Sequence, residues 1–173
     1  MVKKGAKKVK AESYIKVTKA LAKNKKLSAA VVLINKAATL IIYVFYIAFL
    51  GFLALSKDPI LLKTLLVPAS SFVVLSIARY CINAPRPYEK IERLTPLYNK
   101  KTLGKSFPSR HTFSGFIIGT VAIFFSVPLG VAVLIISTLL AVSRVLCGVH
   151  FVRDVIVGAA VGIGFGLIGM LLF

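Results

Sequence analysis

The sequence contains few acidic residues, few histidines and few cysteines. Of its 173 residues, five are Asp or Glu, against 23 Lys and Arg, and only two are histidine. The two cysteines, Cys81 and Cys147, lie far apart, and neither has a second cysteine at metal-ligand spacing. They therefore indicate neither a metal site nor a redox compartment. No internal repeat is evident, which disfavours a small transporter built from two related halves.

Apolar sequence is abundant. Hydrophobic residues make up 58% of the chain and the mean hydropathy is +0.88, far too apolar for a soluble domain of this length. Because a spanning helix needs about 20 mainly apolar residues, the length allows one compact bundle. We predict an all-α, polytopic membrane helix bundle over residues 37–173, preceded by a lysine-rich interfacial segment over residues 1–36.

The basic residues are concentrated near the N-terminus. Eleven of the 23 lie in residues 1–36, and none of the 17 lysines lies beyond Lys105. Residues 12–26 are predicted to form an amphipathic helix on the membrane surface, where each lysine gains about 1 kcal/mol near anionic lipid headgroups. Its thin apolar side would consist of Tyr14, Ile15, Val17, Ala20 and Leu21. Nucleic acid is not expected as a partner, since no aromatic or motif signature accompanies the lysines.

The apolar runs predict five transmembrane helices. They cover residues 37–55, 61–80, 111–127, 131–146 and 155–173, and a sixth would form if residues 12–35 entered the membrane. Pro68 should kink the second helix, which a bundle tolerates when a neighbouring helix satisfies the freed carbonyl. The uncharged Pro128-Leu129-Gly130 is predicted to turn the chain. The last helix has glycines at four-residue spacing, typical of close helix packing: Gly158, Gly162 and Gly166.

Two polar stretches lie on one membrane face in this topology. Residues 79–110 carry eight basic residues against two glutamates, and residues 144–154 add further charged groups. Two crossings separate the stretches, so the chain returns to the same face. Ionisable groups at membrane depth are functional candidates by default, although an interfacial cluster that merely reaches water is the alternative. The predicted polar surface consists of Arg79, Arg86, Ser109, Arg110, His111, Arg144, His150 and Asp154.

Both histidines belong to this surface. Two neutral imidazoles allow one to attack as a nucleophile while the other acts as a general acid. Asp154 follows His150 by four residues, so on a helical turn its carboxylate would hold one ring nitrogen and leave the other free to attack. The alternative interpretation is a structural ion pair between Asp154 and Arg153 or Arg144.

Several arginines around one point favour a multi-oxygen anion as the ligand. Guanidinium forks match phosphoryl oxygens bidentately and neutralise the charge that develops during phosphoryl transfer. Two histidines and one carboxylate are a conceivable zinc-ligand set, but the adjacent arginines would repel the ion. We therefore expect a phosphoryl group in this site and no metal.

Three motifs in the sequence resemble the signature of the type 2 phosphatidic acid phosphatase superfamily: Arg79-x6-Arg86-Pro87, Pro108-Ser109-Arg110-His111 and Ser143-Arg144-x5-His150-x3-Asp154. The resemblance implies a metal-independent lipid phosphatase without a cofactor. In it His150 would form a phosphohistidine, His111 would protonate the departing oxygen, and Asp154 would orient His150. The groups implied to hold the phosphoryl oxygens are Arg79, Arg86, Arg144 and the Ser109 hydroxyl.

Two positions depart from the family's usual pattern. The family usually has lysine where Arg79 stands and glycine where Arg110 stands. The first difference keeps the charge. The second replaces a residue that lets the backbone approach phosphate closely, so Arg110 either points away from the site or adds a further cation to it.

The resemblance also suggests substrates. Small bacterial members of the family act on lipid A 1-phosphate, undecaprenyl diphosphate or phosphatidylglycerophosphate. Basic residues near the site favour a lipid with more than one phosphate, so lipid A 1-phosphate is our first expectation; these residues are Lys90, Arg93, Lys100, Lys101 and Lys105. Non-catalytic binding of anionic lipid is the other class of function, but it gives no reason for the two histidines and Asp154.

The expected location is the bacterial inner membrane, which the chain would cross several times. With five crossings the lysine-rich tail and the site loop share a face, and the positive-inside rule would make that face cytoplasmic. The resemblance to envelope enzymes favours the periplasmic face instead. We prefer the periplasmic face, because catalytic arginines raise the loop's basic count for reasons unrelated to membrane insertion.

Overall fold

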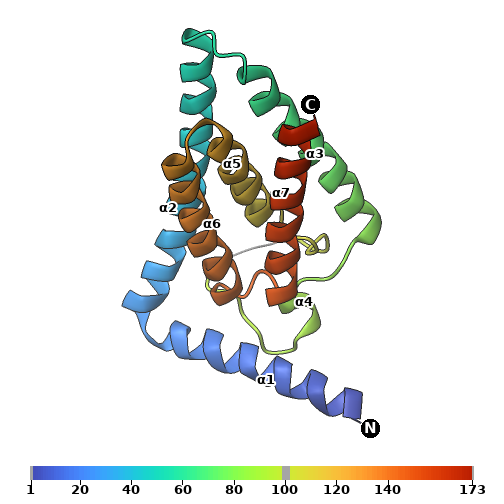
Figure 1. Ribbon diagram of the computed structural model, residues 1–173. Coiled ribbons are helices and arrows are strands. Elements are labelled where there is room, and N and C mark those ends of the chain that lie inside the picture. Colours follow the sequence, from blue (N-terminus) through green and yellow to red (C-terminus); the bar gives the residue numbers. More distant parts are fainter. Residues whose placement is uncertain (1, 99–101, 173) are drawn as a thin grey trace.

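The computed structural model describes residues 2–98 and 102–172, with side chains described from Glu12 onward. Lys100 and Lys101, which the sequence places in the basic loop, lie outside the described residues, as do the side chains of the first lysines. The described residues form a bundle of helices (Figure 1). Its elements are α1 (Val2–Lys23), α2 (Lys25–Leu55), α3 (Leu61–Ile82), α4 (Pro87–Lys90), α5 (Arg110–Phe125), α6 (Val127–Leu146) and α7 (Val152–Leu172).

The polytopic membrane bundle predicted from the sequence is confirmed. Helices α2, α3, α6 and α7 are long and apolar enough to cross a membrane, whereas α5 has only 16 residues. Large apolar side chains are exposed on the outside of the bundle, as expected of a surface that faces lipid: Ile47 is 71% exposed and Leu55 88% exposed. Helix α1 is not among the described helices that meet these criteria for a span.

Helix α1 crosses one end of the bundle, below α6 and α7 in Figure 1. The Val152 amide donates a hydrogen bond to the Tyr14 hydroxyl over 2.7 Å, and the Tyr14 ring meets Phe151 edge to face. Thr18 is buried, while Val17 is 46% exposed. The side of α1 that packs on the bundle is therefore centred on Tyr14 and Thr18, and the predicted apolar side that faces the membrane stays a prediction.

Helix α2 begins twelve residues before the predicted start of the first span at residue 37. The side chain of Asn24 accepts a hydrogen bond from the Leu27 amide over 3.1 Å and so caps the first turn. The helix continues to Leu55, its predicted end. The prediction missed this start because it considered only the apolar part of the helix. The division of the chain at residue 36 stays a prediction.

Helix α3 runs without a break through Pro68. A proline has no amide hydrogen, so the carbonyl four residues earlier, that of Thr64, loses its partner within the helix. The hydroxyl of Tyr46 on α2 donates a hydrogen bond to this carbonyl over 2.9 Å. The expectation that a neighbouring helix would satisfy the freed carbonyl is therefore confirmed.

The turn between α5 and α6 differs from the prediction. Helix α5 ends at Phe125 and α6 begins at Val127, so Ser126 alone reverses the chain in an extended conformation. Pro128 lies in the first turn of α6, where its missing amide hydrogen costs no helix bond. A Cβ on Gly130 would lie 2.5 Å from the Ile123 amide nitrogen, so this glycine allows the two helices to approach closely.

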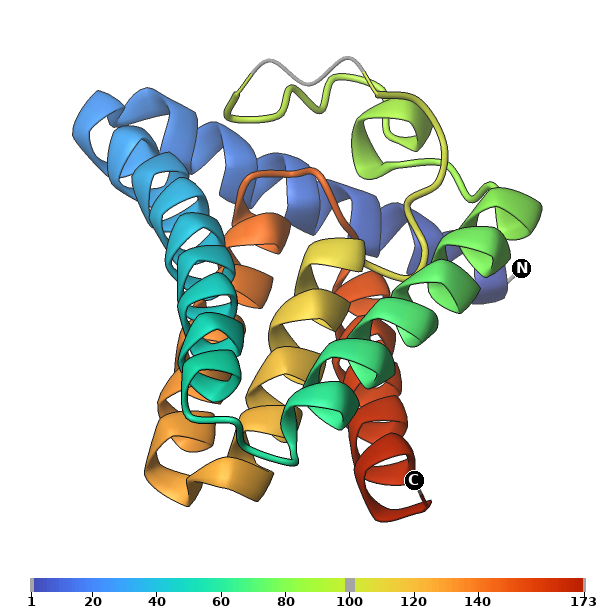
Figure 2. The same ribbon diagram turned by 90° about the horizontal axis from the view of Figure 1, so that it is seen from above.

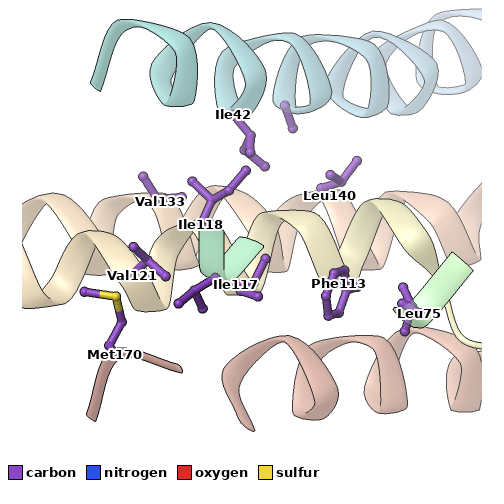
Figure 3. Close-up of a cluster of buried hydrophobic side chains, with 11 residues drawn as sticks. Ile42, Leu75, Phe113, Ile117, Ile118, Val121, Val133, Leu140 and Met170 are labelled. Carbon is purple, nitrogen blue, oxygen red and sulfur yellow. The ribbon is translucent and has the colours of Figure 1, made fainter. Parts of the chain in front are cut away.

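Helix α5 lies at the centre of the bundle. Its side chains Phe113, Ile117 and Val121 are at most 1% exposed and form the core with residues from the surrounding helices (Figure 3). The first turn of α5 is already buried among the other helices, since Ser109 and Thr112 are fully buried. The helix also brings the motif at its N-terminus, residues 108–111, into the interior.

The glycines of α7 pack against α5, as predicted. A Cβ on Gly158 would lie 2.7 Å from the Ser109 carbonyl oxygen, and one on Gly162 would lie 2.7 Å from the Phe113 carbonyl oxygen. Apart from the adjoining residues and backbone of α7 itself, no heavy atom of the described residues lies within 4 Å of a Cβ built on Gly164. The spaced glycines therefore allow α7 to approach the α5 backbone closely.

We expect Gly162→Ala to lower the melting temperature in detergent by about 5 °C, since the added methyl would push apart two backbones at a cost of about 1–3 kcal/mol. Gly164→Ala is the matched control and should leave the melting temperature unchanged or raise it slightly. Equal melting temperatures for the two variants would show that close packing of α7 on α5 contributes little to stability.

Candidate active site

The loop before α5 and the turn between α6 and α7, which carry most of the predicted polar groups, lie at the end of the bundle that α1 crosses (Figure 2). The Ser109 amide donates a hydrogen bond to the backbone carbonyl of Asp154 over 2.8 Å. Nη1 of Arg86 donates one to the backbone carbonyl of Val149 over 3.2 Å. These bonds join the loop before α5, the loop after α3 and the turn between α6 and α7. The prediction that the two polar stretches share a face is therefore confirmed.

His150 is buried in the short segment between α6 and α7, with 2% of its surface exposed. Its Nδ1 lies 3.6 Å from Oδ2 of Asp154 and 3.4 Å from the Ser106 hydroxyl. The Ser106 hydroxyl in turn donates to the same carboxylate oxygen over 2.5 Å. Both neighbours lie on the Nδ1 side of the ring, which leaves Nε2 as the nitrogen available for attack.

Burial lowers the pKa of His150 to about 3, and the positive charges of Arg144 and Arg86 act in the same direction. The hydrogen bond with Asp154 opposes this shift but does not outweigh it. A lowered pKa means that the imidazole is neutral at physiological pH. Neutral imidazole is the form that has a lone pair for nucleophilic attack.

Asp154 is fully buried at the start of α7. Its Oδ2 also accepts a hydrogen bond from the Phe151 amide over 3.1 Å, and Nε of Arg153 lies 3.4 Å from Oδ1. Arg153 is 61% exposed, so this ion pair lies at the edge of the site. The sequence offered His150 and Arg153 as alternative partners of this carboxylate, and in the structure it lies near both. Its Oδ2 faces His150 and its Oδ1 faces Arg153.

Arg79 and Arg86 are buried and are bonded to backbone carbonyls. The guanidinium of Arg79 donates to the carbonyls of Ser106, Pro108 and Lys105. Nε of Arg86 donates to the Gly104 carbonyl over 3.1 Å, in addition to its bond to Val149. These two arginines hold the loop before α5 against the rest of the site, and their predicted contacts with phosphate stay predictions.

Arg144 differs from the other two arginines. Its Nη1 donates to Oδ1 of Asn35 and to the Tyr98 hydroxyl, each over 3.2 Å. Its Nε and Nη2 are buried and have no hydrogen-bond partner among the described residues. Buried donors without a partner are costly, and a phosphoryl group with several oxygens would satisfy both.

The remaining candidates lie at the N-terminus of α5. Ser109 is fully buried, and its hydroxyl accepts a hydrogen bond from Thr112 over 3.0 Å. His111 is partly exposed and lines a cleft together with Arg144. Arg110 is exposed, and its guanidinium lies 5.3 Å from the centre of the Phe72 ring on α3. Its charge still acts on the guanidinium of Arg79, so whether Arg110 points away or adds a cation stays a prediction.

The comparisons with known proteins identify the family of the chain and show which solved structures have a similar fold. The sequence matches the family description "PAP2 superfamily" over residues 39–173. The chain belongs to the PAP2 superfamily. No curated protein matches its sequence.

Two crystal structures of PAP2 relatives have similar folds. LpxE of Aquifex aeolicus is 25% identical, with a TM-score of 0.74 and coverage of 92% of this chain and 93% of that one. The transmembrane PAP2-type phosphatidylglycerolphosphate phosphatase of Bacillus subtilis is 22% identical, with a TM-score of 0.72 and coverage of 92% and 83%. The chain therefore shares the fold of these two structures.

Three polar residues around the PAP2 motifs were not predicted as site residues. Ser106 contacts the pair formed by His150 and Asp154, whereas Asn35 and Tyr98 contact Arg144. The Asn35 amide also donates to the Ser143 hydroxyl over 3.0 Å. Asn35 interrupts an apolar run, which was the available signal for it; nothing in the local sequence distinguished Ser106 from other hydroxyl residues.

Ser106→Ala is expected to lower kcat about 10- to 100-fold while leaving KM nearly unchanged, since it removes a hydrogen bond to a buried carboxylate that positions His150. The measurement is steady-state phosphate release, with the melting temperature recorded for each variant. Ser70→Ala is the matched control, because that exposed hydroxyl bonds only to carbonyls of its own helix. A change in KM and melting temperature with kcat preserved would indicate a purely structural role.

Proposed function

We propose that this PAP2 protein is a metal-independent phosphatase of phosphorylated membrane lipids and that it acts through a phosphohistidine on His150. The observation that carries the proposal is a buried imidazole of lowered pKa, 3.6 Å from Asp154, in a site where two donors of Arg144 have no partner within the described part of the chain. Three buried arginines against one buried carboxylate leave a positive excess, which an anionic substrate would neutralise.

The proposed reaction uses the residues in the following roles. Nε2 of His150 forms a bond to phosphorus while the bond from phosphorus to the lipid oxygen breaks, and His111 donates a proton to that oxygen. A water then attacks the phosphohistidine, its proton passes to His111, and inorganic phosphate leaves. Arg144 neutralises the charge on the phosphoryl oxygens, with Arg79, Arg86 and the Ser109 hydroxyl as further ligands.

Lipid A 1-phosphate is the substrate we propose first, with undecaprenyl diphosphate and phosphatidylglycerophosphate as the alternatives. The similarity to the PAP2 structures from Aquifex aeolicus and Bacillus subtilis supports a membrane lipid as the substrate class. The basic loop supports a lipid with more than one phosphate, and its described members Lys90, Arg93 and Lys105 are exposed.

The test is phosphate release by the detergent-purified protein from these three lipids in excess chelator, with His150→Ala as the control. We expect release that survives the chelator and disappears in the control, and the preferred lipid identifies the substrate. Chelator-sensitive release would contradict metal independence. Absence of release from all three, with retained binding of anionic lipid by His150→Ala, would favour non-catalytic lipid binding.

We propose further that the protein lies in the bacterial inner membrane with the site at the periplasmic face. Helix α1 packs on the site through Tyr14, so its lysines and the site belong to one face. A cysteine introduced at exposed Glu92, in a chain whose own Cys81 and Cys147 are replaced, should react with a membrane-impermeant maleimide in intact spheroplasts. Reaction only after lysis would place the site in the cytoplasm.

A further inference from the structure

A cleft of about 350 Å³ lies beside the candidate active site. Its lining includes Arg144 and His111 of the candidate active site and Lys36, Leu40 and Tyr43 of α2. The cleft therefore continues from the proposed phosphoryl site to a surface of α2 that takes no part in the three motifs.

The α2 residues of the cleft form one stripe. Positions 36, 40 and 43 follow each other at spacings of four and three, which places their side chains on the same face of the helix. All three residues are exposed. The stripe changes from a cation to apolar and aromatic side chains along the helix, as the headgroup and the chains of a lipid would require.

Asn35, the residue before Lys36, joins α2 to the candidate active site. Asn35 is buried and bonds to both Ser143 and the Nη1 of Arg144. Lys36, the next residue of α2, lines the same cleft as Arg144, the arginine with two donors that have no partner among the described residues.

Lys36 has an unusual sequence environment. It is the one charged residue between Leu27 and Leu55. The ion pairs within the described part of the chain involve Asp154, and none of them includes Lys36. A lone ammonium in an apolar helix needs either water or an anionic partner.

We propose that the cleft binds the part of the substrate lipid beyond the reacting phosphate, with a second phosphoryl group on the Lys36 ammonium. The first carbons of the lipid chain lie against Leu40 and Tyr43, while Arg144 holds the reacting phosphate. This inference rests on the proposed lipid phosphatase function, and it predicts that the preferred lipids carry a second phosphoryl group. It assigns recognition of the second phosphate to α2 rather than to the basic loop alone.

The test compares two lipids that differ by one phosphate, dioleoylglycerol diphosphate and dioleoyl phosphatidic acid, in detergent micelles with the full-length protein. Lys36→Met should raise KM about tenfold for the diphosphate and less than about twofold for phosphatidic acid, with kcat unchanged for both. Lys36→Glu should enlarge the difference. Lys26→Met is the matched control, because that exposed lysine of the same helix lies outside the cleft.

A binding measurement separates this inference from the proposed activity. In the His150→Ala background, Lys36→Met should weaken binding of the diphosphate lipid to nanodisc-embedded protein about tenfold and leave phosphatidic acid binding unchanged. Selective loss of binding without any phosphate release by the parent protein would support the cleft and overturn the phosphatase function. Phosphate release by the parent protein with equal effects of Lys36→Met on both lipids would overturn the cleft assignment, as expected of a lysine that only reaches water.

Discussion

His150→Ala is expected to reduce phosphate release at least about 10⁴-fold, the scale observed when a nucleophile or its direct partner is removed. The reason is that, of the two imidazoles in the site, only that of His150 is buried near the charges of Arg144 and Arg86, whereas His111 is partly exposed. His150 is neutral because its pKa lies near 3, and its Nδ1 side is occupied by Asp154 and Ser106. The measurement is initial-rate phosphate release in detergent.

His150→Gln keeps more of the buried volume and should be equally inactive, so a folding defect can be separated from lost chemistry by comparing melting temperatures. Rapid quenching of the wild-type reaction with alkali should trap a labelled phosphohistidine that is stable to base and labile to acid. His111→Ala should slow its formation, since the departing oxygen loses its proton donor. Appreciable turnover by both His150 variants would contradict the assignment of the nucleophile.

The sequence alone predicted which polar stretches lie together. Counting apolar crossings placed residues 79–110 and 144–154 on one face, and the bonds from Arg86 to Val149 and from Ser109 to Asp154 confirm it. This inference depends only on the number of membrane crossings between the two stretches. It therefore holds even where the predicted ends of the helices are wrong by several residues. The late predicted start of α2 and the misplaced turn before α6 left it intact.

The residues that support the site could not be predicted in the same way. Asn35 lies 109 positions from Arg144, and only the packing of α2 on α6 brings them into contact. Ser106 is close in sequence to the motif at residues 108–111, but its contact with Asp154 depends on the path of the loop that Arg79 holds through the Ser106 carbonyl. Periodicity identifies the buried face of a helix, whereas a side-chain hydrogen bond depends on the register between two helices or the path of a loop.

The three arginines show the same limit of sequence reasoning. Their charges predicted an anion site, but the sequence could not show which guanidinium has free donors. In the structure Arg79 and Arg86 bond to carbonyls of the loops that they hold. Arg144 is bonded through one nitrogen, and its two others have no partner among the described residues. Positive charge alone therefore does not describe the proposed role of Arg144. Its guanidinium must keep its bonds to Asn35 and Tyr98 and also offer two donors to one phosphoryl group.

Arg144→Lys is accordingly expected to lower kcat/KM about 10²- to 10³-fold although the charge is retained. One ammonium cannot keep the bonds to Asn35 and Tyr98 and also present two donors in the plane of a phosphoryl group. Arg93→Lys, the same change at an exposed position of the loop, should leave kcat/KM unchanged. Near-normal turnover by Arg144→Lys would mean that the site needs only charge at this point, and the fork geometry would then have no part in catalysis.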